Sequence, residues 1–215
     1  MKNRWFGLIV VVLMLVASAV LYAYLPERVP THWNARGEVD GWSSRGVAAF
    51  LMPLLGLGMW ALLNVLPKID PKRANYERFD ETYWLVVGLI ILFLGVIHGA
   101  MLANALGVPI GMERITPLGV GLLFVVLGNY LPRVKPNWWM GIRTPWTLES
   151  PHVWQRTHRV GGWCFVAAGV LLMISTLLPA HLLIWAVVLV TAVASLVPTV
   201  YSYLLWRREA RGAES

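Results

Sequence analysis

The 215-residue sequence is poor in charge and in cysteine, and each shortage excludes a class of protein. Charged residues make up 13% of the chain, about half the share usual in soluble domains, while 58% of the residues are apolar. This composition argues against a soluble single-domain enzyme. The single cysteine, Cys164, cannot form an internal disulfide or a thiolate metal site, and its neighbours Trp163 and Phe165 favour a buried structural thiol.

Six apolar runs dominate the chain, each near the roughly 20 residues that cross a bilayer core about 30 Å thick. They cover residues 6–25, 47–66, 84–106, 115–131, 162–178 and 182–203. None contains Asp, Glu, Lys or Arg, because burying a charge in hydrocarbon is costly. The sequence therefore predicts an all-α integral membrane protein with six transmembrane helices.

Basic residues are distributed unevenly between the two sides of these runs. Fourteen of the 18 Lys and Arg residues lie in the N-terminal segment, the second and fourth connecting segments and the C-terminal tail. The positive-inside rule then predicts that both termini are cytoplasmic. It also accounts for the net charge of +7, so we expect no direct binding of nucleic acid.

The first apolar run has two interpretations. Lys2, Arg4 and the small-residue triplet at 17–19 are typical of a cleaved secretory signal. The apolar run continues through Leu25, however, beyond the usual signal core of roughly 7–15 residues. We favour a retained helix.

Few polar residues lie inside the runs, and His98 and Asn104 are the main candidates for a role there. Gly95 and Gly99 flank His98 at a spacing that lets another helix approach closely. His98 is either a proton or ion relay or a neutral histidine hydrogen-bonded to a neighbouring helix. The lack of an intramembrane carboxylate favours the second interpretation.

The segment between the second and third runs contains aromatic residues at helical spacing. Tyr76, Phe79 and Tyr83 predict a short amphipathic helix whose aromatic face meets lipid or protein. We divide the chain after it, into an N-terminal two-helix region, residues 1–83, and a four-helix region, residues 84–215.

Two connecting loops concentrate the residue types that bind ligands. The outer loop, between the first two runs, contains the candidate site residues His32, Trp33, Asn34, Gly37, Asp40 and Trp42. The inner loop, between the fourth and fifth runs, contains Asn137, Gly141, Arg143, Thr144, Pro145, Trp146, Thr147, Trp154, Thr157 and His158. Ser150 and Pro151 form a good helix start, after which Trp154, Thr157 and His158 share a stripe that continues into the fifth run.

The inner loop resembles the signature of the SdpI family of bacterial membrane immunity proteins, chiefly through the run GIRTPWTL at 141–148. The outer loop, with the pattern PxHWNxxGxxDxW, and the later segment 69–76 resemble an uncharacterised domain that often precedes that signature. The resemblance implies a multi-pass protein of the bacterial plasma membrane that protects its producer against a secreted peptide toxin of the sporulation-delaying type. For the family's best-known member it also implies that the toxin-bound protein holds a small winged-helix repressor at the membrane.

The chemistry of the loops leaves alternatives open. Arg143 could bind a phosphate or carboxylate, with membrane lipid headgroups as the nearest partner, or could hydrogen-bond loop carbonyls and fix the entry to the fifth run. The outer-loop residues are the better candidates for first contact with an extracellular peptide. A small transporter or channel using His98 and Asn104, and a lipid-handling protein with His158 as base, are the other functions considered.

Catalytic and metal-binding motifs are not found in the sequence. It has no phosphate-cradling glycine loop, no nucleophile elbow and no convincing set of metal ligands. We therefore predict that the protein is not an enzyme, with no catalytic residues, no metal and no cofactor. The sequence leaves the oligomeric state open.

Overall fold

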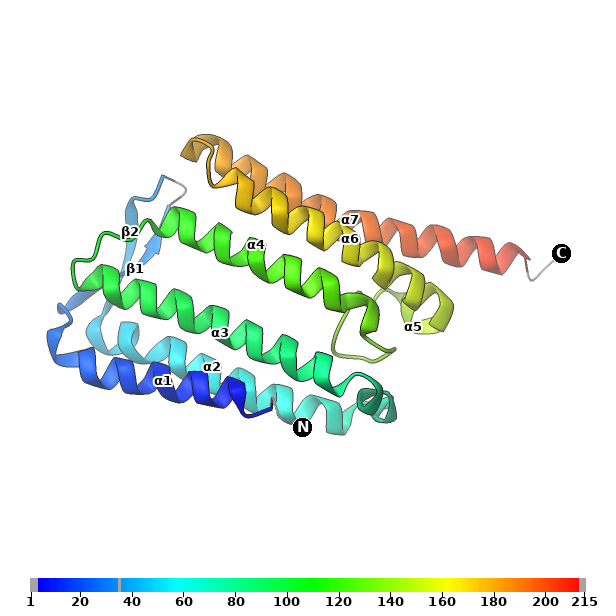
Figure 1. Ribbon diagram of the computed structural model, residues 1–215, viewed down its shortest axis with the longest axis horizontal. Coiled ribbons are helices and arrows are strands. Elements are labelled where there is room, and N and C mark those ends of the chain that lie inside the picture. Colours follow the sequence, from blue (N-terminus) through cyan, green and yellow to red (C-terminus); the bar gives the residue numbers. More distant parts are fainter. Residues whose placement is uncertain (1–3, 35, 213–215) are drawn as a thin grey trace.

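A computed structural model describes residues 4–34 and 36–212, and it is built around six long helices (Figure 1). These are α1 (Phe6–Leu21), α2 (Arg45–Ile69), α3 (Asp80–Ala105), α4 (Met112–Tyr130), α6 (Pro151–Ser175) and α7 (Ala180–Gly212). Short 3-10 helices, η1 (Tyr22–Tyr24) and η3 (Leu131–Arg133), continue α1 and α4. All six helices are long and apolar enough to cross a membrane, which confirms the predicted fold class.

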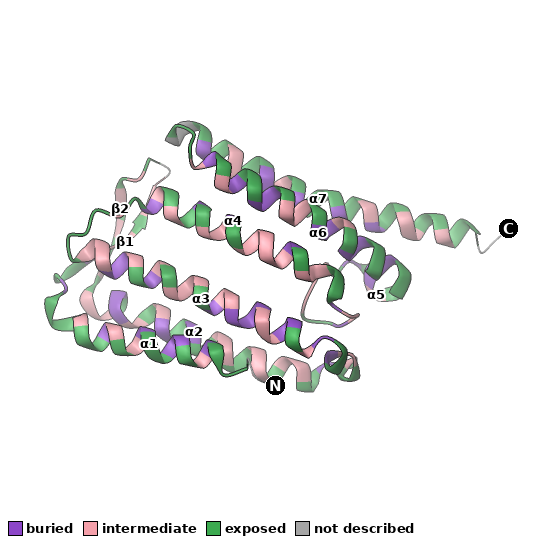
Figure 2. Ribbon diagram, viewed as in Figure 1, coloured by how far each residue is buried: buried purple, intermediate pink, exposed green. Residues whose placement is uncertain are grey.

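The helices form two groups of three. Helices α1, α2 and α3 pack on one another, α6 packs on both α4 and α7, and a contact between α3 and α4 joins the groups (Figure 1). Large apolar side chains such as Leu13, Leu171 and Leu189 are exposed. Exposed residues recur along all six long helices (Figure 2). In water such a surface would be unfavourable, whereas in a bilayer it faces hydrocarbon.

Helices α4 and α6 approach each other through two pairs of glycines. A Cβ atom placed on Gly121 would lie 2.7 Å from the backbone oxygen of Gly169, and one on Gly128 would lie 2.6 Å from that of Gly162. The two pairs are one heptad apart on both helices, so the backbones are in contact over about two turns. Side chains larger than hydrogen would separate them, as in other helix pairs packed through small residues.

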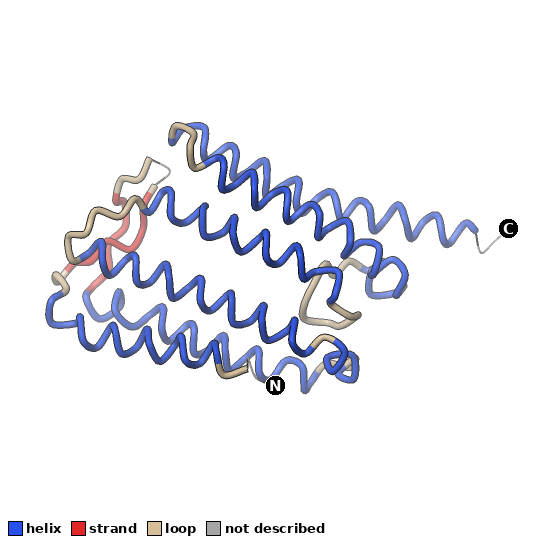
Figure 3. Tube along the Cα trace, viewed as in Figure 1, coloured by secondary structure: helices blue, strands red, loops and turns tan. Residues whose placement is uncertain are grey.

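One element departs from an all-helical chain. Strands β1 (Arg28–Trp33) and β2 (Val39–Ser44) form an antiparallel hairpin between α1 and α2 (Figure 3). Val29 is fully buried against Ala48 and Ala49 of α2, and Ser44 caps α2 by accepting from the amide of Val47. The hairpin end of the bundle is the end that carries these strands; the opposite end, which carries the inner loop and most Lys and Arg residues, is the basic end.

The aromatic segment before α3 differs from the predicted single amphipathic helix. The 3-10 helix η2 (Arg73–Arg78) is followed by Phe79, whose non-helical φ of −144° and ψ of 25° separate it from α3. Tyr76, Phe79 and Tyr83 are buried together and pack on α1 and on Trp154, so their aromatic face meets protein and not lipid. The predicted start of α6 at Ser150 and Pro151 is confirmed, since Ser150 Oγ accepts from the amide of Val153.

Candidate binding sites at the two ends of the bundle

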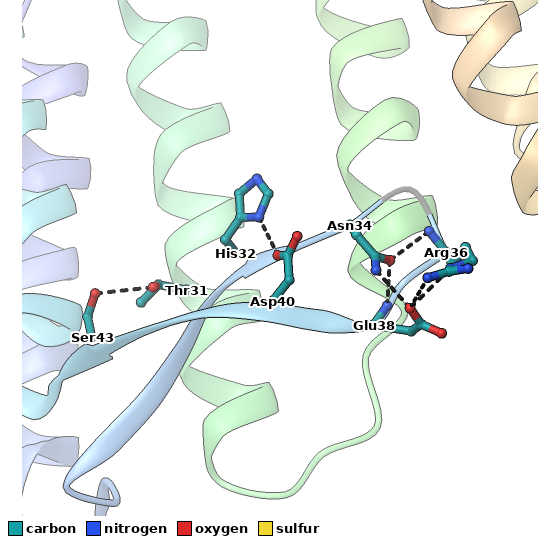
Figure 4. A network of polar contacts seen from close by, with 7 residues as sticks. All are labelled: Thr31, His32, Asn34, Arg36, Glu38, Asp40 and Ser43. Carbon is teal, nitrogen blue, oxygen red and sulfur yellow. Dashed lines mark hydrogen bonds and ion pairs between the residues drawn. The ribbon is translucent and has the colours of Figure 1, made fainter.

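Asn34 organises the tip of the hairpin (Figure 4). Its side-chain oxygen accepts from the amides of Arg36 (2.9 Å) and Glu38 (3.1 Å), and its side-chain nitrogen donates to the Glu38 carboxylate (2.8 Å). The bond from Asn34 to the Glu38 carboxylate, and then the charge of Arg36, hold the pKa of Glu38 below its ordinary value. Gly37 takes a φ of +79°, which favours glycine, and lies directly against the Glu113 side chain of α4.

His32 and Asp40 face each other across the two strands, next to this tip (Figure 4). His32 Nδ1 lies 2.5 Å from an Asp40 carboxylate oxygen, and the two side chains are 72% and 45% exposed. The sequence placed both residues in one motif, and the hairpin brings them into direct contact. Exposure leaves the other imidazole nitrogen accessible to a ligand.

The two tryptophans of the outer motif differ in their surroundings. Trp33 packs against the buried cluster formed by Leu25 and Val29 with α2 and α3, whereas Trp42 is 54% exposed. Trp33 also lines a groove, but Trp42 does not. The structure therefore separates a residue that the sequence grouped with the others.

A groove of about 390 Å³ lies at the hairpin end, between the hairpin and helices α4, α6 and α7. Its polar residues are His32 and Asn34 from the hairpin, Glu113 and Thr116 from α4, and Thr191 from α7. Apolar side chains form most of the rest, including Leu172 of α6 and Val187 of α7. A mostly apolar cleft with a few convergent polar groups is the usual form of a small ligand site.

At the basic end, Asn137 forms hydrogen bonds within the inner loop and with the segment before α3. Its side-chain oxygen accepts from the amides of Trp139 (2.8 Å) and Met140 (2.6 Å), and its nitrogen donates to the carbonyls of Lys135 and Met140. The Tyr76 hydroxyl also lies 3.3 Å from the Asn137 oxygen. Asn137 is fully buried, so the loop depends on these bonds.

Asp70, in the segment before α3, also joins that segment to the inner loop. Its carboxylate accepts from the amides of Lys72 (2.7 Å) and Trp138 (2.9 Å) and from the Tyr76 hydroxyl (2.9 Å), and it is only 2% exposed. Burial and the Asp70 hydrogen bond raise the pKa of Tyr76. The segment 69–76 and the inner loop, 61 residues or more apart in sequence, are therefore one polar unit.

His158 supports the middle of the inner loop. Its Nδ1 donates to the Trp154 carbonyl (2.8 Å) and its Nε2 accepts from the amide of Ile142 (3.1 Å), a pattern that requires the neutral imidazole. Both nitrogens are occupied and the ring is fully buried, which argues against a catalytic base. Gly141 lies directly above Nε2 with a φ of +109°, so a side chain there would meet the ring.

The end of the inner loop forms helix α5 (Pro145–Glu149). Thr144 and Thr147 cap each other reciprocally, since each side-chain oxygen accepts from the other residue's amide. Thr144 Oγ1 also lies 3.0 Å from Ser202 Oγ of α7, and the Trp146 ring packs on Tyr203 at a centroid distance of 5.0 Å. The loop is therefore attached to α7 as well as to α6.

In this structure Arg143 hydrogen-bonds a carbonyl of the inner loop, which is one of the two roles considered for it. Its guanidinium donates to the carbonyl of Trp138 (2.7 Å), while the side chain stays exposed. Arg156 and Arg159 are also exposed on the first turns of α6.

Thr157, on the same helix, is fully buried, and its hydroxyl has no hydrogen-bond partner in the part of the chain that the structure describes.

Polar residues inside the spans make structural contacts. Ser18 of α1 donates to the carbonyl of Ala49 in α2 (2.6 Å) and accepts from His98 Nε2 in α3 (2.8 Å), so one hydroxyl joins three helices. This is the arrangement expected of a histidine bonded to a neighbouring helix. Asn104 donates to the carbonyl of Ile110 (3.2 Å), which fixes the turn after α3.

Of the two glycines beside His98, only Gly95 has a close neighbour, because a Cβ there would lie 3.0 Å from Val10. Gly99 has open space, so the predicted close contact at both positions is only half correct. Residues 4–34 and 36–212 contain no group of three or more His, Cys, Asp or Glu side chains that could hold a metal ion.

Several residues of these sites were missed by reasoning from the sequence. Ser202 and Glu113 are far in sequence from the loops that they contact, so no local pattern marks them. Asp70 belongs to the segment 69–76 that the resemblance singled out, but its contact with the inner loop is at long range. Glu209 of α7 pairs with His152 and accepts from Ser150, again at long range. The paired glycines of α4 and α6 did carry a signal, a seven-residue spacing repeated in two spans.

The fold defines a multi-pass membrane protein that carries a polar cluster at each end of its apolar spans. Residues 133–202 match the SdpI/YfhL protein family, and residues 9–57 match a domain of unknown function, DUF1648. The resemblances of the inner loop and of the outer loop are thereby confirmed, and so is the assignment to a bacterial membrane. The segment 69–76 lies between the two matched ranges, so its resemblance stays a prediction.

The chain is similar to a curated protein of similar length. Immunity protein SdpI of Bacillus subtilis (strain 168) is 25% identical over 208 residues, which are 97% of this chain and 98% of that protein. No solved structure matches the chain.

Proposed function

We propose that the protein is an immunity protein that binds part of a secreted peptide toxin of the sporulation-delaying type in the groove at its hairpin end. The observation that carries the proposal is the lining of that groove, in which His32, Trp33 and Asn34 meet the apolar walls of α4, α6 and α7. The similarity to Immunity protein SdpI over nearly the whole chain supports the same role.

The groove suits an amphipathic peptide. Its apolar walls accept apolar side chains, whose transfer from water contributes roughly 25 cal/mol per Å² of buried area. His32, Asn34 and Glu113 lie at the hairpin side and provide polar partners for the peptide backbone or for a basic group. Capture there keeps the toxin from acting on the membrane.

Filling the groove tests this proposal. Val187→Trp places a large ring in the groove, and Val188→Trp is the matched control because Val188 is outside the groove and 54% exposed. A sensitive bacterium producing either variant at wild-type membrane level is challenged with the toxin, and depolarisation is recorded. We expect V187W to lose protection and V188W to keep it; equal protection by both variants would contradict capture in the groove.

We further propose that the basic end serves signalling by holding a repressor at the membrane. Arg143, Arg156 and Arg159 are exposed there and give an acidic protein surface a complementary face. Arg156→Gln with Arg159→Gln is expected to abolish recruitment of the repressor, seen by cell fractionation, without changing toxin resistance. Recruitment unchanged in this variant would remove these residues from the interaction.

A further inference from the structure

The basic end contains a groove that the toxin-binding proposal does not use. It has a volume of about 600 Å³ and is bounded by the segment 72–78, the segment 132–136 and the first turns of α6. Asn75 donates to the carbonyl of Pro136 (2.7 Å), which holds two of these walls together. The groove is therefore built jointly by the segment that precedes α3 and by the inner loop.

The charges in the groove have one sign. Lys72, Arg78 and Lys135 line it, and no carboxylate does. Within residues 4–34 and 36–212, neither Arg78 nor Lys135 forms an ion pair, and Lys72 donates only to the carbonyl of Leu148 (3.3 Å). The positive end of the α6 dipole, at Pro151, also borders the groove.

The acidic residues of this region are gathered elsewhere. Glu77, Asp80 and Glu81 line a neighbouring hollow together with Arg133, and this hollow shares Arg78 and Lys135 with the groove. The three carboxylates there offset the three basic side chains, whereas the charged residues that line the groove are all basic. A negatively charged ligand is therefore attracted more strongly to the groove than to the hollow.

The floor of the groove is apolar, which indicates more than a free anion. Val134 and Trp154 are 4% and 1% exposed, and prolines 132, 136 and 151 are the other apolar residues of the lining, whose uncharged polar residues are Asn75 and Gln155. The groove also lies where η3 ends the fourth span and where α3 begins, and the same loop exposes Trp138 and Trp139. Exposed tryptophans mark the headgroup level of a bilayer.

We propose that this groove binds the headgroup of an anionic phospholipid. Lys72, Arg78 and Lys135 pair with its phosphates, and the glycerol backbone and the first acyl carbons lie over Val134 and Trp154. Basic pockets between spanning helices are suited to such headgroups. A lipid bound there contacts both the segment before α3 and the inner loop, and so stabilises the junction that Asp70 and Asn137 form.

Lipid binding by the full-length protein in a neutral detergent tests the proposal, because no charged membrane surface is then present. Phosphatidylglycerol and phosphatidylcholine are titrated separately, and bound lipid is counted by native mass spectrometry. The groove variant is K72Q/R78Q/K135Q. The matched control is R207Q/R208Q/R211Q, which removes the same charge from exposed positions of α7 outside the groove.

We expect wild type and control to retain one phosphatidylglycerol in preference to phosphatidylcholine, and the groove variant to bind it roughly 100-fold more weakly. An equal loss in both variants would overturn the proposal. So would displacement of the lipid by inorganic phosphate at similar concentration, which would indicate a site for soluble anions, or by an acidic peptide, which would indicate a protein-docking site.

A second variant and a second measurement serve as controls for misfolding. The thermal midpoint without lipid is recorded for each protein, and Lys135→Gln alone replaces the triple variant if that variant melts early. We expect phosphatidylglycerol to raise the midpoint of wild type and control and to leave that of the groove variant unchanged. The measurement involves no toxin, so its failure and the failure of toxin capture are distinguishable.

Discussion

Gly141 is the position in the inner loop where we expect a larger side chain to be most destabilising. Gly141→Ala imposes a positive φ on alanine and places a methyl group against His158 Nε2. We expect a loss of roughly 3 kcal/mol in unfolding free energy, from backbone strain and overpacking together. Denaturation in detergent, followed by tryptophan fluorescence, measures it.

Substitutions at two other glycines distinguish backbone strain from overpacking. Gly107 has a φ of +93° with open space around it, so Gly107→Ala adds strain alone and should cost about 1 kcal/mol. Gly99→Ala, in the interior of α3 with open space, should cost nothing. If G141A and G107A were equally stable, contact with His158 would not matter.

Tyr76 gives the stability a defined pH dependence. Burial and the hydrogen bond to Asp70 raise its pKa in the folded protein, so above about pH 10 the folded state keeps a proton that the unfolded chain loses. The unfolding free energy should therefore fall with rising pH, by up to about 1.4 kcal/mol per unit from this group. Tyr76→Phe should reduce that slope; the same slope in both proteins would show that Tyr76 contributes nothing.

At the scale of elements, the contact between α4 and α6 depends on side-chain size. Gly128→Ala would place a methyl group 2.6 Å from the Gly162 oxygen, and the backbone cannot move as a flexible side chain would. We expect a loss of roughly 1–3 kcal/mol in unfolding free energy. Gly58→Ala in α2, with no atom within 4 Å, is the control, and the two should have equal stability if the helices are loosely packed.

At the scale of the whole molecule, the distribution of basic residues predicts that the hairpin end faces outward. Cys164 is the single cysteine, so a Cys164→Ala background accepts one new thiol at a chosen place. In intact cells a membrane-impermeant maleimide should label Arg36→Cys, at the hairpin tip, and not Arg211→Cys, at the end of α7. The reverse pattern would invert the topology and move the toxin groove to the wrong side.

The family resemblance and the local signals were readable because each depends on neighbouring residues. The run GIRTPWTL, the cap at Ser150 and the stripe of Trp154, Thr157 and His158 all belong to one stretch, and helical spacing relates them directly. The roles of these residues could not be read in the same way. Arg143 had two interpretations and His158 was considered as a base. Their bonds to Trp138, Trp154 and Ile142 are visible only in the tertiary structure.

The sequence by itself determined the six spans, because burying a charge or an unpaired backbone group in hydrocarbon leaves an uncharged apolar helix as the available solution for each. Tertiary structure alone decided which distant residues meet. Asp70 with Trp138, Ser18 with His98, and the hairpin with α4 and α7 are joined only when the helices pack. Packing depends on complementary shape between segments far apart in the chain, and composition or period in one segment does not encode its partner.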